Sequence, residues 1–253
     1  MPHSKSVAVV FLQPHCNMTC DFCVTEDDFD RMTPAQVTTL LEHLRRRRFT
    51  AVVFGGGEPF AWPGDLVAIT EHARRLGFMV QVGTNGTVLP DGFARISSID
   101  RYVLPLEAVR PEIHDRMRRW PGGHHAVIMR RLGDLKEARR SVTLSTVVTA
   151  INLDEIVAIG RFLAHYHRDA QHVHAWHLYR FLPLGRGGSV NAEALEIPET
   201  EYRRIVREVR HLRLPFKVFK RADMYDSKTV EFFWCSEGRV VTGEQAWRGC
   251  VVG

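Results

Sequence analysis

Three cysteines, Cys16, Cys20 and Cys23, lie within eight residues of one another in the spacing CxxxCxxC. This spacing lets three thiolates approach one inorganic centre from a single loop. A structural zinc site usually has four protein ligands, and an ordinary cubane iron–sulfur cluster takes one thiolate for each iron. Three thiolates on a [4Fe–4S] cube therefore leave one iron open to another ligand. The pattern favours a cluster of this kind.

A zinc site or a set of disulfides would account for less of the sequence. A zinc site would need His15 as its fourth ligand, but residues adjacent in sequence rarely reach the same ion. Disulfides would require an oxidising compartment and a dense, even set of cysteines, whereas this chain has five in 253 residues. The apolar run that follows Ser6 is too short for a signal peptide. We therefore expect reduced thiols in a cytoplasmic protein.

Two further turns contain residues suited to binding a ligand. Residues 55–59 read GGGEP and follow the apolar segment 51–54, and residues 84–86, TNG, follow the apolar segment 78–82. Glycine lets the main chain approach a ligand without a Cβ in the way. Each turn alone is also a common connection after a strand, so neither is specific by itself.

Strand-length apolar segments alternate with amphipathic, helix-length segments along most of the chain. This alternation predicts a parallel sheet with helical crossovers, which right-handed connections would curl into a barrel or part of one. We expect an α/β fold, a partial (β/α)6 TIM-like barrel, over residues 1–212. Residues 213–253 are expected to form a short extension whose hairpin, 229–234 with 239–242, closes the barrel. The six expected strands are 7–12, 51–54, 78–82, 102–106, 142–149 and 173–181.

The cysteine loop, the GGGEP turn and the TNG turn follow successive expected strands, at the strand ends where barrels place active sites. Together they resemble the motifs of the radical S-adenosylmethionine (radical SAM) superfamily. The resemblance implies that Cys16, Cys20 and Cys23 bind a [4Fe–4S] cluster whose open iron is chelated by SAM. An external one-electron reductant, a flavodoxin or a ferredoxin-like protein, would then cleave SAM. The resulting 5′-deoxyadenosyl radical would abstract a hydrogen atom from the substrate.

The resemblance also implies which residues contact SAM. The glycine motif would approach the SAM amino group with support from Glu58, and Thr84 and Asn85 would lie near the ribose. Arg180 would hold either the ribose or a carboxylate of the substrate. The expected cofactor contacts are Phe22, Gly56, Gly57, Glu58, Pro59, Thr84, Asn85, Ser145 and Arg180.

Residues 111–118, PEIHDRMR, are similar to a segment in the branch that includes molybdopterin-biosynthesis and peptide-maturing enzymes. The fourth strand of that branch usually ends in Ser-Leu-Asp-Gly, whereas residues 105–108 of this chain read PLEA. The longer acidic side chain indicates an altered substrate wall. We expect Glu107, Tyr179 and Arg180 to position the substrate.

The C-terminal extension carries the remaining cysteines, Cys235 and Cys250. They resemble the start of the auxiliary-cluster extension of peptide-maturing relatives, but such extensions need more cysteines than two. We therefore expect no complete auxiliary-cluster domain. Residues 224–227, MYDS, and the GGGEPF run resemble the viperin-like nucleotide dehydratases, although the lysines that grip a triphosphate there have no counterpart here.

Composition argues against membrane and nucleic-acid functions. No stretch approaches the ~20 apolar residues of a membrane helix, and the net charge of +5 comes mostly from arginines scattered among helical segments. No basic patch interleaved with aromatic residues is present. We expect a small-molecule or nucleotide-like substrate in a biosynthetic pathway. A radical SAM enzyme acting on a peptide or protein, and a non-catalytic iron–sulfur or zinc protein, remain as alternatives.

Overall fold

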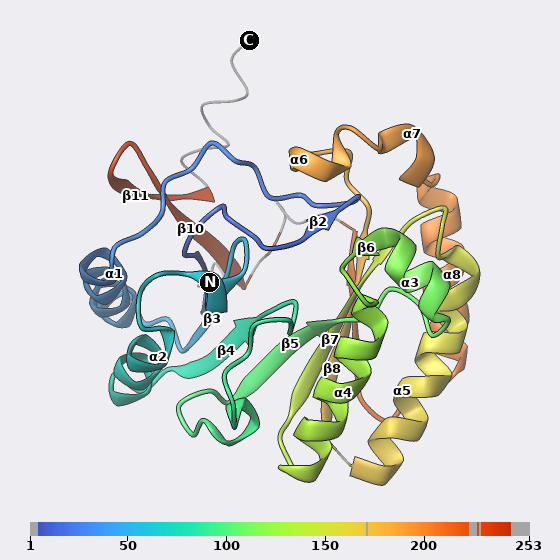
Figure 1. Cartoon of the computed structure of the whole chain (residues 1–253), viewed down its shortest axis with the longest axis horizontal. Coiled ribbons are helices and arrows are strands. Elements are labelled where there is room, and N and C mark those ends of the chain that lie inside the picture. The colour runs from blue at the N-terminus through green and yellow to red at the C-terminus, as the bar shows by residue number, and fades with distance from the viewer. Residues whose placement is uncertain (1–4, 171, 223–226, 228, 244–253) are drawn as a thin grey trace.

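A nine-stranded sheet, in the order β11-β10-β1-β3-β4-β5-β7-β8-β9, forms the centre of the computed structural model, which describes residues 5–170, 172–222, 227 and 229–243 (Figure 1). Neighbouring strands are parallel except β10 and β11, which form an antiparallel hairpin. The strands are β1 (Val7–Phe11), β3 (Ala51–Gly55), β4 (Met79–Gly83), β5 (Arg101–Pro105), β7 (Val142–Val148), β8 (Val173–Arg180), β9 (Lys217–Arg221), β10 (Val230–Ser236) and β11 (Arg239–Thr242).

The expected α/β class with a largely parallel sheet is confirmed, and the six predicted strands and the C-terminal hairpin are all present. Two strands of the C-terminal segment join the six predicted ones, because β9 pairs with β8 and β10 pairs with β1. The sequence of β9, KVFKR, lacks an apolar run because it is a short, charged edge strand. Within the described residues β9 and β10 do not pair with each other, so the sheet is open there.

The short connection between β9 and β10 requires the sheet to curve. A flat sheet would separate these two strands by about 34 Å at the usual spacing between strands. The nine peptide units from Arg221 to Val230 extend at most about 32 Å. Because the connection must also return from the end of one parallel strand to the start of the other, the strands wrap around a concave face.

Helices cover the outer side of this curved sheet (Figure 1). The first of them begins with a capping box, in which Thr33 and Gln36 bond each other's backbone N–H, followed by Pro34. The longer helices are α1 (Pro34–Arg46), α2 (Leu66–Arg75), α4 (His124–Glu137), α5 (Ile156–Ala170) and α8 (Glu199–His211). The shorter ones are α3 (Pro111–Met117), α6 (Gly185–Gly188) and α7 (Ala192–Leu195).

The main hydrophobic core lies between the sheet and these helices, which settles the orientation of β8. Trp176 and Leu178 are fully buried in this core, and the Tyr202 hydroxyl of α8 donates to the Leu178 carbonyl at 2.7 Å. Because side chains alternate along a strand, His177 and Tyr179 project from the opposite, concave side.

A separate two-stranded ladder holds the cysteine loop in place. In it β2 (Thr19–Cys20) pairs antiparallel with β6 (Arg118–Arg119), so that Cys20 lies opposite Arg118. The backbone N–H of Asp21 extends this contact by donating to the Met117 carbonyl at 3.2 Å. The PEIHDRMR segment therefore supports the loop that contains the three cysteines.

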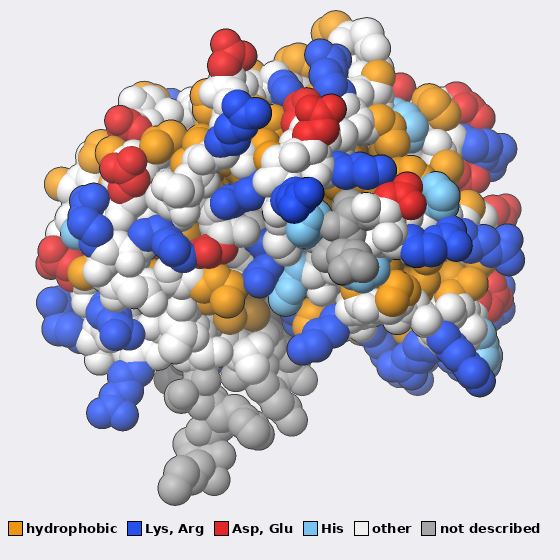
Figure 2. Space-filling view, turned by 90° about the horizontal axis from the view of Figure 1, so that it is seen from below, with side chains coloured by type: hydrophobic (Ala, Val, Ile, Leu, Met, Phe, Trp, Pro, Cys, Tyr) orange, Lys and Arg blue, Asp and Glu red, His pale blue; other side chains and the backbone are white. Residues whose placement is uncertain are grey.

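The face drawn in Figure 2 carries no continuous basic band. Its Lys and Arg side chains are spread among acidic, apolar and uncharged ones. None of the helices in the described part of the chain has the length and apolar character needed to cross a membrane.

Candidate functional site

The three loop cysteines lie at the carboxyl end of β1, and each is partly exposed, whereas Cys235 is buried. A tight turn closes the loop, because the Cys23 N–H donates to the Cys20 carbonyl at 3.1 Å. The turn after β8 packs directly on it. A Cβ at Gly187 would come within 2.3 Å of the Cys20 carbonyl oxygen, so only glycine fits there without displacing the loop.

The three loop thiols are the donors that could hold a metal group. No group of three or more His, Cys, Asp or Glu side chains among the described residues is arranged around one ion. A cubane cluster instead takes each thiolate on a different iron. Burial raises the pKa of the Cys20 thiol to about 11; Arg118 opposes this rise, and the nearby Cys23 and Cys16 contribute to it. The thiolates repel one another, and a metal centre bound there would stabilise them because its cysteine ligands must be deprotonated.

The GGGEP turn packs against the cysteine loop. Its Gly57 N–H donates to the Gln13 carbonyl at 2.7 Å, and its Glu58 N–H donates to the His15 carbonyl at 3.0 Å. A Cβ at Gly57 would lie 1.8 Å from the His15 carbonyl oxygen. The glycines of the motif therefore allow two strand-end loops to meet.

Glu58 joins the second motif to the third. Its carboxylate is fully buried and accepts from the Thr84 hydroxyl at 2.7 Å, the Asn85 N–H at 2.7 Å and the Phe60 N–H at 3.1 Å. Burial raises the pKa of Glu58, and these three donors oppose that shift. The Asn85 amide in turn lies 3.6 Å from the Cys16 sulfur. Three predicted contact residues, Glu58, Thr84 and Asn85, thus gather beside Cys16.

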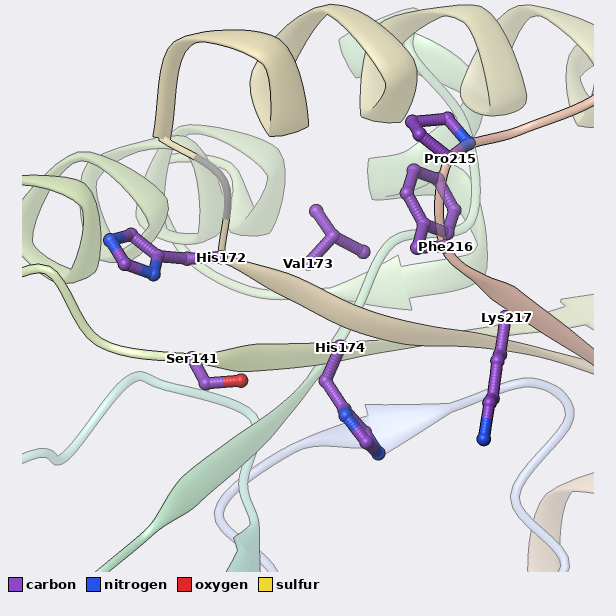
Figure 3. A pocket seen from close by; sticks show the side chains of 7 residues that line it. All are labelled: Ser141, His172, Val173, His174, Pro215, Phe216 and Lys217. Carbon is purple, nitrogen blue, oxygen red and sulfur yellow. The ribbon is translucent and has the colours of Figure 1, made fainter.

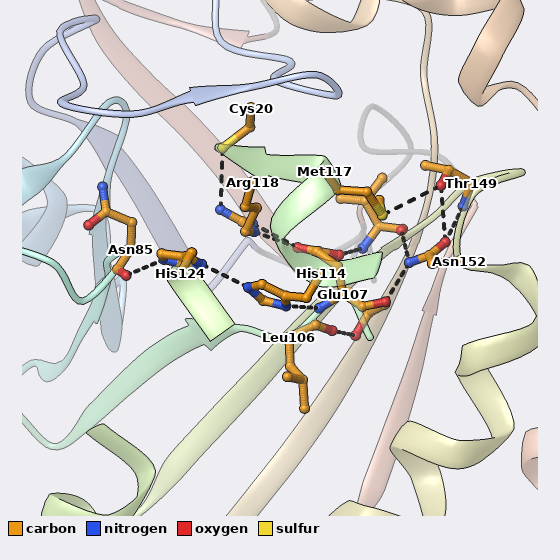
Figure 4. Close-up of polar contacts among 12 residues, drawn as sticks. Cys20, Asn85, Leu106, Glu107, His114, Met117, Arg118, His124, Thr149 and Asn152 are labelled. Atoms are coloured by element: carbon orange, nitrogen blue, oxygen red, sulfur yellow. Dashed lines mark hydrogen bonds and ion pairs between the residues drawn. The ribbon is translucent and has the colours of Figure 1, made fainter. Parts of the chain in front are cut away.

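Glu107 and Arg118 form a buried ion pair beside Cys20 (Figure 4). The Arg118 Nε and Nη2 atoms lie 2.9 and 2.8 Å from Glu107 Oε1, and the Val147 N–H donates to Glu107 Oε2 at 2.8 Å. The guanidinium also covers the Phe22 ring at 4.9 Å from its centroid. Burial lowers the pKa of Arg118, but Glu107 and Cys20 outweigh this and raise it, so the guanidinium stays charged.

The expectation that Glu107 faces the substrate gains no support from this placement. Its side chain is fully buried and its oxygens are occupied by Arg118 and Val147. The longer acidic side chain at this position reaches Arg118, an interaction that the sequence did not indicate.

A buried histidine pair, which the sequence analysis did not predict, connects Glu107 to Asn85. The Glu107 N–H donates to His114 Nδ1 at 3.1 Å, so the hydrogen of this ring is on Nε2, 2.8 Å from His124 Nδ1. His124 Nε2 then donates to the Asn85 carbonyl at 2.7 Å. Burial, followed by Arg118, lowers the pKa of His114 to about 2 and that of His124 to about 3. Only the position of His114 within PEIHDRMR could have drawn attention to it.

The predicted residues of β8 and β7 lie apart from these groups. Tyr179 projects into the concave side with its hydroxyl 3.4 Å from His177 Nδ1. Arg180 points to the start of α8, where its Nη1 lies 3.9 Å from Glu199. Ser145 is half-buried in β7, and its carbonyl accepts from the Leu106 N–H at 2.9 Å. The structure does not bring Arg180 and Tyr179 to a common point.

The C-terminal cysteines and residues 224–226 add no ligand to the cysteine loop. The Cys235 sulfur faces α1, where the Gln36 amide lies 3.5 Å away. Cys250 and residues 224–226 lie outside the described residues.

Two cavities differ in their relation to the cysteines. One of about 400 Å³ borders the cysteine loop and is lined by Thr19, Cys20, Asp21, Arg119, Arg186, Gly187, Val190 and Asn191. The other, of about 490 Å³, lies at the amino-terminal ends of β7, β8 and β9 (Figure 3). Its lining residues are Ser141, His172, Val173, His174, Pro215, Phe216 and Lys217. Because the motifs lie at the other ends of the strands, we assign the site to the first region.

The chain is similar to proteins of one superfamily. The family model of the radical SAM superfamily matches residues 10–163. The chain is 24% identical to an AdoMet-dependent heme synthase of Oleidesulfovibrio alaskensis over 74% of this chain and 48% of that protein. It is 25% identical to an S-adenosylmethionine-dependent nucleotide dehydratase of Selenomonas ruminantium over 57% of each chain. The chain thus spans about half the length of these curated relatives.

Solved structures share the fold at low sequence identity. Streptococcus suis SuiB bound to S-adenosylmethionine superimposes with a TM-score of 0.74 at 13% identity, covering 94% of this chain and 60% of that one. Native anSMEcpe with bound AdoMet gives 0.60 at 15% identity, covering 81% and 60%. The match of the family model to more than half of the chain identifies this protein as a member of the radical SAM superfamily, whose members are enzymes.

Proposed function

We propose that this chain is a radical SAM enzyme in which Cys16, Cys20 and Cys23 hold a [4Fe–4S] cluster with SAM at the open iron. When bound and reduced by an external flavodoxin or ferredoxin-like protein, the cluster and SAM supply a 5′-deoxyadenosyl radical that abstracts a substrate hydrogen. The observation that carries the proposal is the meeting of the cysteine loop, the GGGEP turn and the TNG turn at the carboxyl ends of neighbouring strands.

The surrounding residues would position the cofactors rather than react with them. Glu58 fixes the Thr84–Asn85 turn, which suits this turn to hold part of SAM. The half-buried Gly56 and its neighbour Pro59 shape the wall beside it. Packing of Gly187 on the cysteine loop would hold the loop in position.

We propose a small-molecule or nucleotide-like substrate with an anionic group. The concave side carries His177 and Tyr179 next to β9, where the His177 and Phe219 rings are 5.0 Å apart and Arg221 covers Phe219 at 5.1 Å. An arginine beside aromatic rings suits a carboxylate or phosphate attached to a planar group. Relatives named as a heme synthase and a nucleotide dehydratase support this class of substrate. Of the three predicted substrate residues, Tyr179 is the best placed to contact a substrate on the concave side. Arg180 points to Glu199 at the start of α8 and would act on the substrate only through that helix.

A peptide substrate is the second candidate. The chain is 28% identical to a PqqA peptide cyclase of Rhizobium meliloti over 57% of this chain. Either class of substrate requires an enzyme that cleaves SAM, so SAM cleavage is the first property to measure.

The experiment reconstitutes the protein anaerobically with iron and sulfide and measures 5′-deoxyadenosine formed from SAM with dithionite. We expect 5′-deoxyadenosine from the wild type and the loss of both cluster and product in Cys20→Ala. Cys235→Ala is the matched control, because that thiol faces α1 and lies outside the cysteine loop. Equal product from the wild type and Cys20→Ala would overturn the proposal.

A further inference from the structure

Each of the three loop thiols has a side-chain N–H donor, and at Cys23 this donor is Arg186. Arg118 Nη1 lies 3.6 Å from the Cys20 sulfur, and Asn85 Nδ2 lies 3.6 Å from the Cys16 sulfur. Both distances are normal for the large sulfur atom. The donors at Cys20 and Cys23 are charged and the donor at Cys16 is neutral; of the two arginines, Arg118 is the more buried, at 13% exposed against 22% for Arg186.

The orientation of Arg118 is fixed from several sides. Its Nε and Nη2 atoms, on one edge of the planar guanidinium, both contact Glu107 Oε1. This arrangement leaves Nη1 to face Cys20. The β2–β6 ladder sets the backbone of Arg118 opposite Cys20, and the Phe22 ring lies below the guanidinium. The side chain is only 13% exposed, so its charge is weakly screened by solvent.

Glu107, which holds Arg118, is itself part of a larger hydrogen-bond network (Figure 4). The backbone of Glu107 connects through His114 and His124 to the carbonyl of Asn85, whose side chain contacts Cys16. Hydrogen bonds, with Glu107 and Asn85 as links, therefore connect the donors at Cys20 and Cys16. Such a network keeps each donor in a fixed position when the charge of the site changes.

We propose that Arg118, held by Glu107, is a positioning residue that donates a charge-assisted hydrogen bond to the Cys20 thiolate and raises the reduction potential of the cluster. The proposal rests on the proposed function, because it needs a cluster on Cys16, Cys20 and Cys23. Reduction adds one negative charge to the cluster and its thiolates. A fixed cation beside one thiolate stabilises this reduced state more than the oxidised state. An arginine keeps its charge at every accessible pH, so the effect does not depend on titration.

The test measures the midpoint potential of the reconstituted cluster by a redox titration followed by EPR, after the iron content of each variant has been determined. Arg118→Met alone would leave the Glu107 carboxylate buried without its partner, which endangers folding. The main variant is therefore the double substitution Arg118→Met with Glu107→Gln. Arg118→Lys keeps the charge but cannot contact Glu107 and Cys20 through separate, fixed N–H groups.

Arg47→Met with Glu231→Gln is the matched control, since it removes the same two charges from another ion pair with a buried carboxylate, one that joins the end of α1 to β10. We expect the potential of the Arg118→Met and Glu107→Gln double variant to fall by at least about 59 mV, which corresponds to a tenfold change in the reduction equilibrium of a one-electron couple. Arg118→Lys should shift in the same direction by less, and Arg47→Met with Glu231→Gln should match the wild type.

Unchanged potentials in the double variant and in Arg118→Lys, with a normal iron content and SAM cleavage by the wild type, would overturn this inference and leave the proposed function intact. If the double variant bound no cluster, the test would rest on Arg118→Lys. A wild-type potential in Arg118→Lys would then overturn this inference. A wild type that took up no cluster would overturn the proposed function together with this inference.

Discussion

At the scale of single residues, the site depends on buried polar groups that hold motifs together. The Glu58 carboxylate accepts one hydrogen bond from Phe60, just after the GGGEP turn, and two from Thr84 and Asn85 of the TNG turn. The sequence motif drew attention to Glu58 as a contact of SAM. The structure gives it a role in the fold of the site that is independent of any cofactor.

Replacing Glu58 by Gln should destabilise the protein even without cluster or SAM. The amide would present an N–H₂ group to at least one donor and leave it without an acceptor, which costs about 1–3 kcal/mol for a buried group. The free energy of unfolding in urea measures this loss. Glu42→Gln on the exposed side of α1 is the control and should change stability by less than about 0.5 kcal/mol. Equal stability of the two variants would contradict the assignment.

The histidine pair predicts how stability depends on pH. The pKa values of His114 and His124 lie at about 2 and about 3 in the folded protein, against about 6.5 in an unfolded chain. The unfolded state therefore binds more protons between these limits, and the stability supplied by each neutral imidazole is lost as the pH falls below 6.5. Between pH 7.5 and 5.5 each histidine should cost about 1.4 kcal/mol.

Urea unfolding at both pH values tests this expectation. His124→Gln should show a smaller loss between pH 7.5 and 5.5 than the wild type, because one of the two histidines no longer titrates. His165→Gln, at a position that is 66% exposed, should lose as much stability as the wild type. A wild-type loss in His124→Gln would show that this ring is not kept neutral by the fold.

Whether a feature of the site could be predicted from the sequence depends on how far apart its residues lie along the chain. The three cysteines were recognisable because their spacing is local, within one loop. His114 and His124 meet only when α3 packs against α4, and the partner of Glu107 comes from β6. No local pattern encodes these contacts.

At the scale of elements, the predicted strands lie within two residues of the observed ones, because each is a buried apolar run bounded by polar turns. The strand β9 was missed because charged residues stand at its edge position. The partner of β10 was missed because pairing with β1 joins segments more than 220 residues apart in sequence.

The contact between the turn after β8 and the cysteine loop supplies a test at this scale. Gly187→Ala should force the two loops apart, because its Cβ would lie 2.3 Å from the Cys20 carbonyl oxygen and 2.8 Å from the Cys23 nitrogen. We expect a loss of about 1–3 kcal/mol of stability and less iron per chain after reconstitution. Gly133→Ala is the control, since nothing lies within 4 Å of a Cβ at this exposed position of α4. A full iron content in Gly187→Ala would contradict the predicted packing.

At the scale of the whole molecule, the C-terminal segment belongs to the same sheet as the cysteine loop. The strand β10 lies beside β1, and Phe233 is only 1% exposed where it packs against Phe49 in the main core. The domain boundary expected after residue 212 stays a prediction. The pairing of β10 with β1 and of β9 with β8 predicts a single cooperative unit that includes both strands.

Phe233→Ala should therefore destabilise the entire protein by about 3–5 kcal/mol, the usual cost of removing a buried phenylalanine. Urea unfolding followed by both far-UV circular dichroism and tryptophan fluorescence should show one shared transition at lower urea. Val190→Ala, at a position that is 80% exposed, should leave the transition unchanged. Separate transitions in the two signals would show that the C-terminal segment unfolds independently.

The central claim is that the three loop cysteines build a cluster that binds SAM at an open iron. The most direct measurement is EPR of the reconstituted, dithionite-reduced protein with and without SAM under anaerobic conditions. We predict a [4Fe–4S]⁺ signal that SAM perturbs and that Cys20→Ala abolishes. A cluster signal that SAM leaves unchanged, or no cluster on the wild-type chain, would contradict the claim.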